Sequence, residues 1–196
     1  MRRTKLPIVV LSLCTALSCS LRRDVPAPDP TEPQAVAEAA TPDARTEAEI
    51  ETLLSSYMTG LAPFELHRTA EAVVRESKRN HIDVRLTLAV MHTESGYYNF
   101  ARSPVGALGL MQIMPATGEM LADEAGVDWS GPDDLFAPEL NVRLGTRYLA
   151  ILKARYGTWQ KALAAYNWGP AAIDKRLADG NAVPEVYVQQ VYARLK

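Results

Sequence analysis

Glu94 is the residue whose surroundings most favour chemistry. It follows an apolar run, Val84 to Met91, that Asp83 is placed to cap and Gly96 to end, so the pattern predicts a buried helix. A carboxyl group at the end of such a helix lies against apolar walls and the negative pole of the helix dipole, and both raise its pKa. An acid that keeps its proton near neutral pH can act as a general acid. The competing interpretation is a solvated helix end, the commoner role of a Glu in a last turn.

The segment after Glu94 favours the catalytic interpretation. Two tyrosines follow Gly96, and the stretch Ser103 to Pro115 then contains three glycine or proline breaks followed by Met, Gln and Met. Such breaks are typical of a loop that brings bare backbone close to another group. The alternative is a tight turn beneath the core.

Three separated motifs resemble those of a known family, the soluble lytic transglycosylase-like domain of lysozyme-fold enzymes that cleave murein. A fourth match near the C-terminus is weaker, and the resemblance runs from about Leu66 to Lys196. It implies a mainly α, lysozyme-like domain of the goose-type or lytic transglycosylase kind. The motifs are Glu94-Ser95-Gly96, then Gly109-Leu110-Met111-Gln112 with Pro115-Ala116-Thr117 behind it, then Ala165-Tyr166-Asn167 before Gly169-Pro170, and the weaker Tyr187-Val188.

The resemblance also implies a reaction. In this family one Glu protonates the oxygen between N-acetylmuramic acid and N-acetylglucosamine, then draws a proton from the muramic 6-hydroxyl, which closes onto C1 without added water. Glu94 is the only carboxylate in the matching motifs, so it is the expected catalytic residue, and no cofactor is expected. The resemblance further implies that five residues shape the glycan cleft and that Tyr187 orients the acid or the sugar; the five are Ser95, Met111, Gln112, Tyr166 and Asn167.

Two other functions stay open at this point. A hydrolytic muramidase would need a second carboxylate over the cleft, and Asp133, Asp134 and Glu139 are candidates. A glycan-binding module of an envelope assembly would need no acid, and the intact Glu94 argues against it. By residue type alone, Tyr166 and Tyr187 could equally be core tyrosines with bonded hydroxyls.

Charge and metal-ligand patterns exclude other classes. The chain of 196 residues has a net charge of −2, and from Leu61 onward 15 Lys plus Arg balance 15 Asp plus Glu. It therefore presents no overall basic field for a nucleic acid, although a local basic patch remains open. No metal site is predicted, because His67, His81 and His92 form no pair at i, i+4. The acidic residues between Asp128 and Glu139 lack the spacing of a calcium loop.

The first nineteen residues are predicted to be a targeting segment. Basic residues precede an apolar stretch, Leu6 to Leu17, that is too short to span a bilayer comfortably, and Ala16-Leu17-Ser18 stands before Cys19. This resembles a bacterial lipoprotein signal, although Ala16 is smaller than the usual residue there. The resemblance implies lipidation of Cys19, a membrane anchor, and a periplasm-facing location at the outer membrane. Ordinary cleavage before Cys19 is the alternative.

The remaining chain divides by composition. Ser20 to Thr46 contains five prolines and no aromatic residue, which predicts a disordered linker. Residues 47–60 are expected to form a lead-in helix and 61–196 the catalytic domain, with peptidoglycan strands as the partner and envelope-spanning machinery left open. Helices are predicted at Glu47 to Met58, Pro63 to Arg79, Val84 to Glu94, Pro115 to Ala125, Asn141 to Tyr156 and Thr158 to Tyr166, with a loop from Gly126 to Pro138.

Overall fold

The computed structural model describes residues 47–195, and regular secondary structure in that part of the chain is helical apart from two isolated bridges around Leu108. The prediction of a mainly α domain is confirmed. The elements are α2 (Glu47–Ser55), α3 (Pro63–Arg79), α4 (Val84–Ser95), α5 (Pro115–Glu124), the 3-10 helix η2 (Pro132–Phe136), α6 (Pro138–Tyr156), α7 (Trp159–Trp168), α8 (Pro170–Ala178) and α9 (Val186–Ala193).

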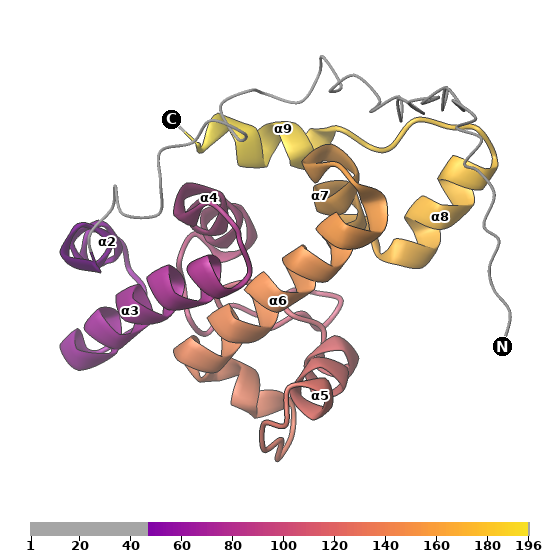
Figure 1. Ribbon diagram of the computed structural model, residues 1–196. Helices are drawn as coiled ribbons and strands as arrows, with labels where there is room; N and C mark the ends of the chain where they lie inside the picture. Colours follow the sequence, from indigo (N-terminus) through magenta and orange to yellow (C-terminus); the bar gives the residue numbers. More distant parts are fainter. Residues whose placement is uncertain (1–46, 196) are drawn as a thin grey trace, which may run out of the picture.

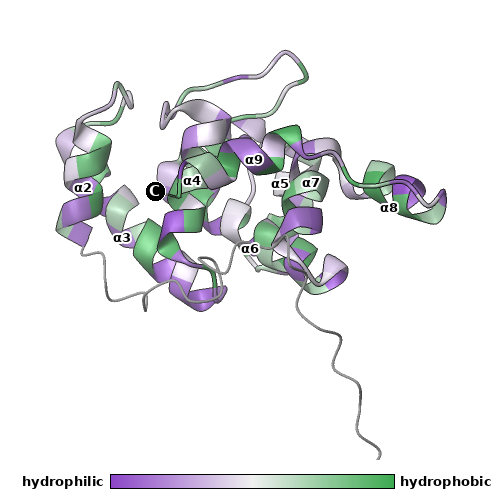
Figure 2. Ribbon diagram, turned by 90° about the horizontal axis from the view of Figure 1, so that it is seen from above, coloured by the Kyte–Doolittle hydropathy of each residue, from purple (hydrophilic) through white to green (hydrophobic). Residues whose placement is uncertain are grey.

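Helix α6 runs through the middle of the molecule, with α2, α3 and α4 on one side of it, α7 and α8 on the other, and α9 lying across α4 and α7 (Figure 1). It packs against both α3 and α7, and its residues Leu144, Leu149 and Leu152 are buried. The helices carry hydrophobic and hydrophilic residues on different sides (Figure 2), as helices do when one face enters a shared core. This arrangement joins the N-terminal and C-terminal helices into one body around α6.

Helix α2 belongs to this body rather than merely leading into it. Its Ile50 and Leu54 are buried in the core, and its Glu51 lies 2.9 Å from His67 on α3. A short helix is marginal alone in water, so this packing is what stabilises it.

Several boundaries differ from those expected. Helix α6 begins three residues early, at Pro138, because proline is well suited to a first helical turn. The region predicted as a loop, Gly126 to Pro138, contains η2, which buries Leu135. Helices α8 and α9 were not predicted, and both are short, at nine and eight residues.

The predictions for Cys19, for the targeting segment and for the linker lie outside the described residues. Among residues 47–195, no helix combines the length and the apolar character that crossing a membrane requires.

Candidate active site

Helix α4 carries Glu94 to the site, and it forms as the sequence predicts. The Asp83 carboxylate accepts a hydrogen bond from the backbone N–H of Arg85 at 2.7 Å, which caps the first turn. Gly96 ends the helix in the left-handed conformation, with φ of 60°, and its N–H donates to the His92 carbonyl. The body of the helix from Val84 to Met91 is buried apart from Arg85, so Glu94 emerges from the core in the last turn.

Glu94 has the electrostatics of a general acid. Burial raises the pKa of Glu94 from 4.5 to about 7, and a hydrogen bond from Tyr187 works in the opposite direction. The Tyr187 hydroxyl donates to Oε1 of Glu94 at 2.5 Å. Helix α9 packs on α4 and so brings together two residues 93 positions apart in the sequence. Near neutral pH both the acid and the carboxylate are therefore populated.

The glycine-containing loop after Glu94 is fixed by a buried side chain from α6. Asn141 is completely buried; its Oδ1 accepts from the Met111 N–H at 2.7 Å, and its Nδ2 donates to the carbonyls of Leu108 and Leu135. Gly109 has φ of 79°, and a Cβ atom there would lie 2.3 Å from Nδ2 of Asn141. Glycine is thus required both for the backbone turn and for the close approach of Asn141.

Ser95 and Met111 link this loop to the surrounding helices. The Ser95 hydroxyl, next to the catalytic candidate, donates to the Leu110 carbonyl at 2.8 Å. The Met111 side chain is fully buried against Gly145, where any Cβ atom would lie 2.4 Å from the Met111 sulfur. Only the backbone of Met111 points toward the site, and its carbonyl accepts from Tyr166 at 2.7 Å.

Tyr166 connects Glu94 to a neighbouring cavity. Burial holds the pKa of the Tyr166 hydroxyl well above its ordinary value, and the charge of nearby Glu94 raises it further. The ring of Tyr166 packs 5.5 Å from that of Tyr148, which stands on the opposite wall. Tyr166 is therefore close enough to Glu94 to feel its charge and at the same time lines the cavity.

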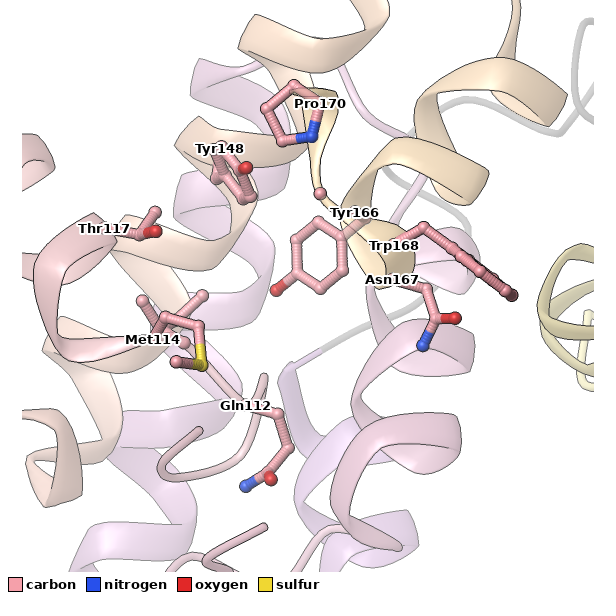
Figure 3. Close-up of a pocket in the computed structure, with 10 residues that line it drawn as sticks. Gln112, Met114, Thr117, Tyr148, Tyr166, Asn167, Trp168 and Pro170 are labelled. Carbon is pink, nitrogen blue, oxygen red and sulfur yellow. The ribbon is translucent and has the colours of Figure 1, made fainter. Parts of the chain in front are cut away.

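The cavity has a volume of about 290 Å³ and lies between α6, α7 and the start of α5 (Figure 3). It brings together the predicted Gln112, Tyr166 and Asn167, whereas Glu94, Ser95, Met111 and Tyr187 are not among its lining residues. It is lined by Gln112, Ile113, Met114, Thr117, Tyr148, Tyr166, Asn167, Trp168, Gly169 and Pro170.

The Gln112 amide points away from Tyr166 and Tyr148 (Figure 3) and is bonded to the loop backbone. Its Nε2 donates to the carbonyls of Ala101 and Gly109 at 3.1 and 2.9 Å, which fixes the orientation of the amide. Its Oε1 accepts from no described residue and is left for a ligand. Gln112 itself has a positive φ of 48°, an uncommon conformation that the surrounding loop imposes.

The candidate second carboxylates have partners elsewhere. Asp133 pairs with Arg102 at 3.2 Å, and Glu139 pairs with Arg68 at 2.8 Å. Asp134 accepts from the N–H of Ser130 at 2.6 Å. None of the three lines the cavity, and no grouping of three His, Cys, Asp or Glu side chains suitable for a metal ion occurs in residues 47–195.

The motifs and their arrangement match a known family. The sequence pattern of the transglycosylase SLT domain matches residues 71–185, more than half of the chain. The chain belongs to this family. The resemblance drawn from the three motifs is thereby confirmed.

Curated relatives of the SLT domain family match a similar stretch. A soluble lytic murein transglycosylase of Salmonella typhimurium is 37% identical over 101 residues, which cover 50% of this chain and 16% of the relative. A membrane-bound lytic murein transglycosylase C of Edwardsiella ictaluri is 38% identical over 117 residues, covering 55% of this chain and 33% of the relative. The chain therefore spans at most about a third of the length of these relatives.

Solved structures agree on the fold. The 70 kDa soluble lytic transglycosylase of Escherichia coli superposes with a TM-score of 0.59 over 79% of this chain and 30% of its own, at 24% identity. The lytic transglycosylase Slt of Pseudomonas aeruginosa gives 0.58 over the same shares. Because both are SLT-type enzymes of lysozyme-like architecture, the fold class predicted for this chain is confirmed.

Three residues at or behind the cavity of the SLT domain were not predicted from the sequence. Asn141 and Tyr148 lie on α6, where the helical pattern predicted only core positions. Trp168 falls between the motif residues Asn167 and Gly169, and it lines the cavity. An Asn amid apolar helix positions was the one local signal that could have suggested a buried anchor.

Proposed function

We propose that this protein is a lytic murein transglycosylase that cleaves the β-1,4 bond between N-acetylmuramic acid and N-acetylglucosamine and leaves a 1,6-anhydromuramic end. The observation that carries the proposal is Glu94: a single half-buried acid whose pKa is about 7, bonded to Tyr187 and adjoining a neutral cavity. Membership of the SLT domain family and the names of both relatives support the same activity.

In the proposed reaction Glu94 acts first as an acid. Its carboxyl proton passes to the glycosidic oxygen as the bond from that oxygen to muramic C1 breaks, and the N-acetylglucosamine end leaves as an alcohol. The developing positive charge at C1 lies beside the new carboxylate, which Tyr187 stabilises by donating a hydrogen bond from its hydroxyl to Oε1.

Glu94 then acts as a base. The carboxylate takes the proton from the muramic 6-hydroxyl, O6 bonds to C1, and the acid is regenerated without consumption of water. A pKa of about 7 suits both steps, because a group that titrates near the working pH can give and take a proton with little penalty.

The pairing of Asp133 and Glu139 with arginines favours this route over hydrolysis. A hydrolase would need a base to activate water, and neither carboxylate lines the cavity next to Glu94. The substrate's own 6-hydroxyl, fixed in the cleft, has a high effective concentration and can take the place of water.

The cleft residues divide into two roles under this proposal. Gln112, Tyr166 and Asn167 line the cavity and contact the glycan, with Oε1 of Gln112 accepting from a sugar hydroxyl or acetamido N–H. Ser95 and Met111 act through the loop backbone that they fix, and Tyr187 orients and tunes the acid.

Digestion of isolated sacculi in ¹⁸O-labelled water tests the reaction type. The released muropeptides are expected to be one water lighter than hydrolysis products and to carry no label, and mass spectrometry measures both. Labelled reducing ends as the main primary product would mean a hydrolase. Glu94→Gln is the matched control, with turnover expected to fall by about 10²- to 10⁴-fold because an amide cannot donate the proton.

The same variant tests whether ionisation of the buried Glu94 side chain destabilises the folded state. The folded state holds the Glu94 proton up to a pKa of about 7 against an ordinary 4.5, so stability falls as pH rises through that window. The free energy of unfolding of Glu94→Gln is therefore expected to exceed that of the parent by about 3 kcal/mol above pH 7. Below pH 4.5 the two values should be equal. Urea unfolding at pH 8 and pH 4 measures the difference. Equal stability at both pH values would show that Glu94 is solvated.

We also propose that residues 1–19 are a lipoprotein-type signal, that Cys19 is acylated, and that residues 20–46 tether the domain, including α2, to the outer membrane. The support is the basic and apolar lead before Cys19, and one of the relatives is named as membrane-bound. Cys19→Ala is expected to leave the protein unprocessed or to release it from membranes. Mass spectrometry of the mature N-terminus and membrane sedimentation measure this, with Cys14→Ala as the control. A soluble parent with an unmodified N-terminus would contradict the anchor.

A further inference from the structure

Trp168 stands at the rim of the cavity, on a stretch of backbone that its neighbours constrain. It is the last residue of α7, the Gly169 N–H closes that helix on the Ala165 carbonyl at 2.9 Å, and Pro170 begins α8 at once. The backbone on both sides of Trp168 is therefore constrained. Trp168 is 56% exposed and lines the cavity next to Asn167, with its indole directed outward from Tyr166 and Tyr148 (Figure 3).

The other two tryptophans of the chain have structural roles. Trp159 is 9% exposed in the core, and Trp129 packs over Gly118, whose hypothetical Cβ would lie 2.9 Å from the indole. The Trp168 side chain by contrast makes no hydrogen bond or ring contact with any residue from 47 to 195. A large exposed indole on a constrained stretch of backbone, without a protein partner, offers a ready contact surface to a ligand.

The residues around Trp168 indicate what kind of ligand fits. The ten residues lining the cavity include no charged side chain, although they offer the amides of Gln112 and Asn167 and the hydroxyls of Thr117, Tyr148 and Tyr166. A neutral cavity that mixes aromatic faces with hydrogen-bonding groups fits a neutral sugar ring, which has both C–H faces and hydroxyls. A peptide stem carries carboxylates, and no cation lines this cavity to receive them.

We propose that Trp168 is a substrate-positioning residue that stacks its indole on the pyranose ring occupying the cavity and so sets the affinity for the glycan strand. The inference rests on the proposed function for the identity of the strand. Glu94 does not line the cavity, so Trp168 takes no part in proton transfer.

Binding of an N-acetylglucosamine hexamer to full-length Glu94→Gln protein tests the contact directly. Trp168 is the only tryptophan exposed among the described residues, so we expect a blue shift of its fluorescence on binding. In the same background Trp168→Ala is expected to lose the shift and to bind about 10-fold more weakly by calorimetry, the loss expected when roughly 50 Å² of apolar contact is removed. Trp168→Phe should recover most of the affinity.

Phe64→Ala is the matched control, because Phe64 is an equally exposed aromatic, at 65%, on α3 and outside the cavity. It should bind like the parent. With Glu94 intact, Trp168→Ala should raise the KM for sacculi and change kcat by less than about three-fold. The reason is that the lost contact binds the ground state and the transition state equally. Affinity unchanged by Trp168→Ala, or a loss that appears in kcat alone, would overturn the inference.

The two proposals fail in different ways. If the hexamer binds with the blue shift while the parent releases no anhydro product, the stacking role stands and the proposed reaction is wrong. If the parent releases anhydro product and Trp168→Ala binds as tightly as Trp168→Phe, the reaction stands and the stacking role is wrong.

Discussion

Two of the walls of the cavity are built in opposite ways. One wall is the loop Gly109–Ile113, whose backbone is bonded to Asn141, Ser95 and Tyr166 and whose apolar side chains lie in the core. The other is the rim Asn167–Pro170, where Asn167 and Trp168 are exposed and have no side-chain bond to any described residue. The difference separates positioning from recognition: the loop fixes backbone and acid relative to one another, and the rim leaves its side chains available to substrate.

The loop owes its rigidity to a polar network inside the core. A buried hydrogen bond is stronger in a low-dielectric interior than in water, and an unpaired buried group costs correspondingly more. Asn141 is therefore stabilising only while all its partners stay in place. The rim has no such network, so changes there are expected to alter binding and to leave the fold intact.

Replacing Asn141, which holds the loop, should destabilise the fold far more than replacing Asn167 on the rim. Asn141→Ala removes three buried hydrogen bonds and leaves the Met111 N–H without an acceptor, so we expect a loss of about 3 kcal/mol in the free energy of unfolding. Asn167→Ala removes an exposed side chain and should change the same free energy by less than about 0.5 kcal/mol. Urea unfolding at one pH measures both.

Activity on sacculi should separate the same pair of variants. Asn141→Ala is expected to lower kcat at temperatures where it is still folded, because the loop that positions Gln112 moves, whereas Asn167→Ala should mainly raise KM. Comparable destabilisation by the two substitutions would contradict the division of the walls.

The sequence predicted the parts of the site that depend on neighbouring residues. Asp83, the apolar body of α4 and Gly96 lie within one short stretch, and each acts on its own helix, so the position of Glu94 followed from local rules. The glycine-rich loop was likewise predicted, because the φ of 79° at Gly109 is a local requirement.

The rest of the site depends on residues that are distant in sequence. No local pattern around Tyr187 indicates that its hydroxyl bonds to Glu94, 93 positions away; only the family resemblance implied that Tyr187 orients the acid or the sugar. Nothing near Asn141 indicates that it anchors Met111, 30 positions away. Both pairings arise from packing of α9 on α4 and of α6 under the loop. Helices α8 and α9 are too short for a periodic pattern to identify, and their stability comes from tertiary contacts.

Tyr187→Phe should sharpen the comparison at the acid itself, with a smaller effect than the loss of Asn141. The Tyr187 hydroxyl favours the charged form of Glu94, so its removal should raise the pKa of Glu94 above its value of about 7. A hydrogen bond to a charged group contributes about 1.5–3 kcal/mol, which corresponds to a shift of one pH unit or somewhat more.

The measurement is the dependence of kcat/KM on pH. The first step needs protonated Glu94, so activity falls as pH rises through the Glu94 pKa, and in Tyr187→Phe this basic limb should move to higher pH by about one unit. Tyr156→Phe is the matched control, because its hydroxyl bonds to Asp174 and Pro170 instead of Glu94, and its profile should overlay that of the parent. A lower kcat/KM with an unmoved basic limb would mean that Tyr187 only packs against α4. A limb that moves to lower pH would mean that Tyr187 stabilises the protonated acid, and that the order of the two proton transfers must be reconsidered.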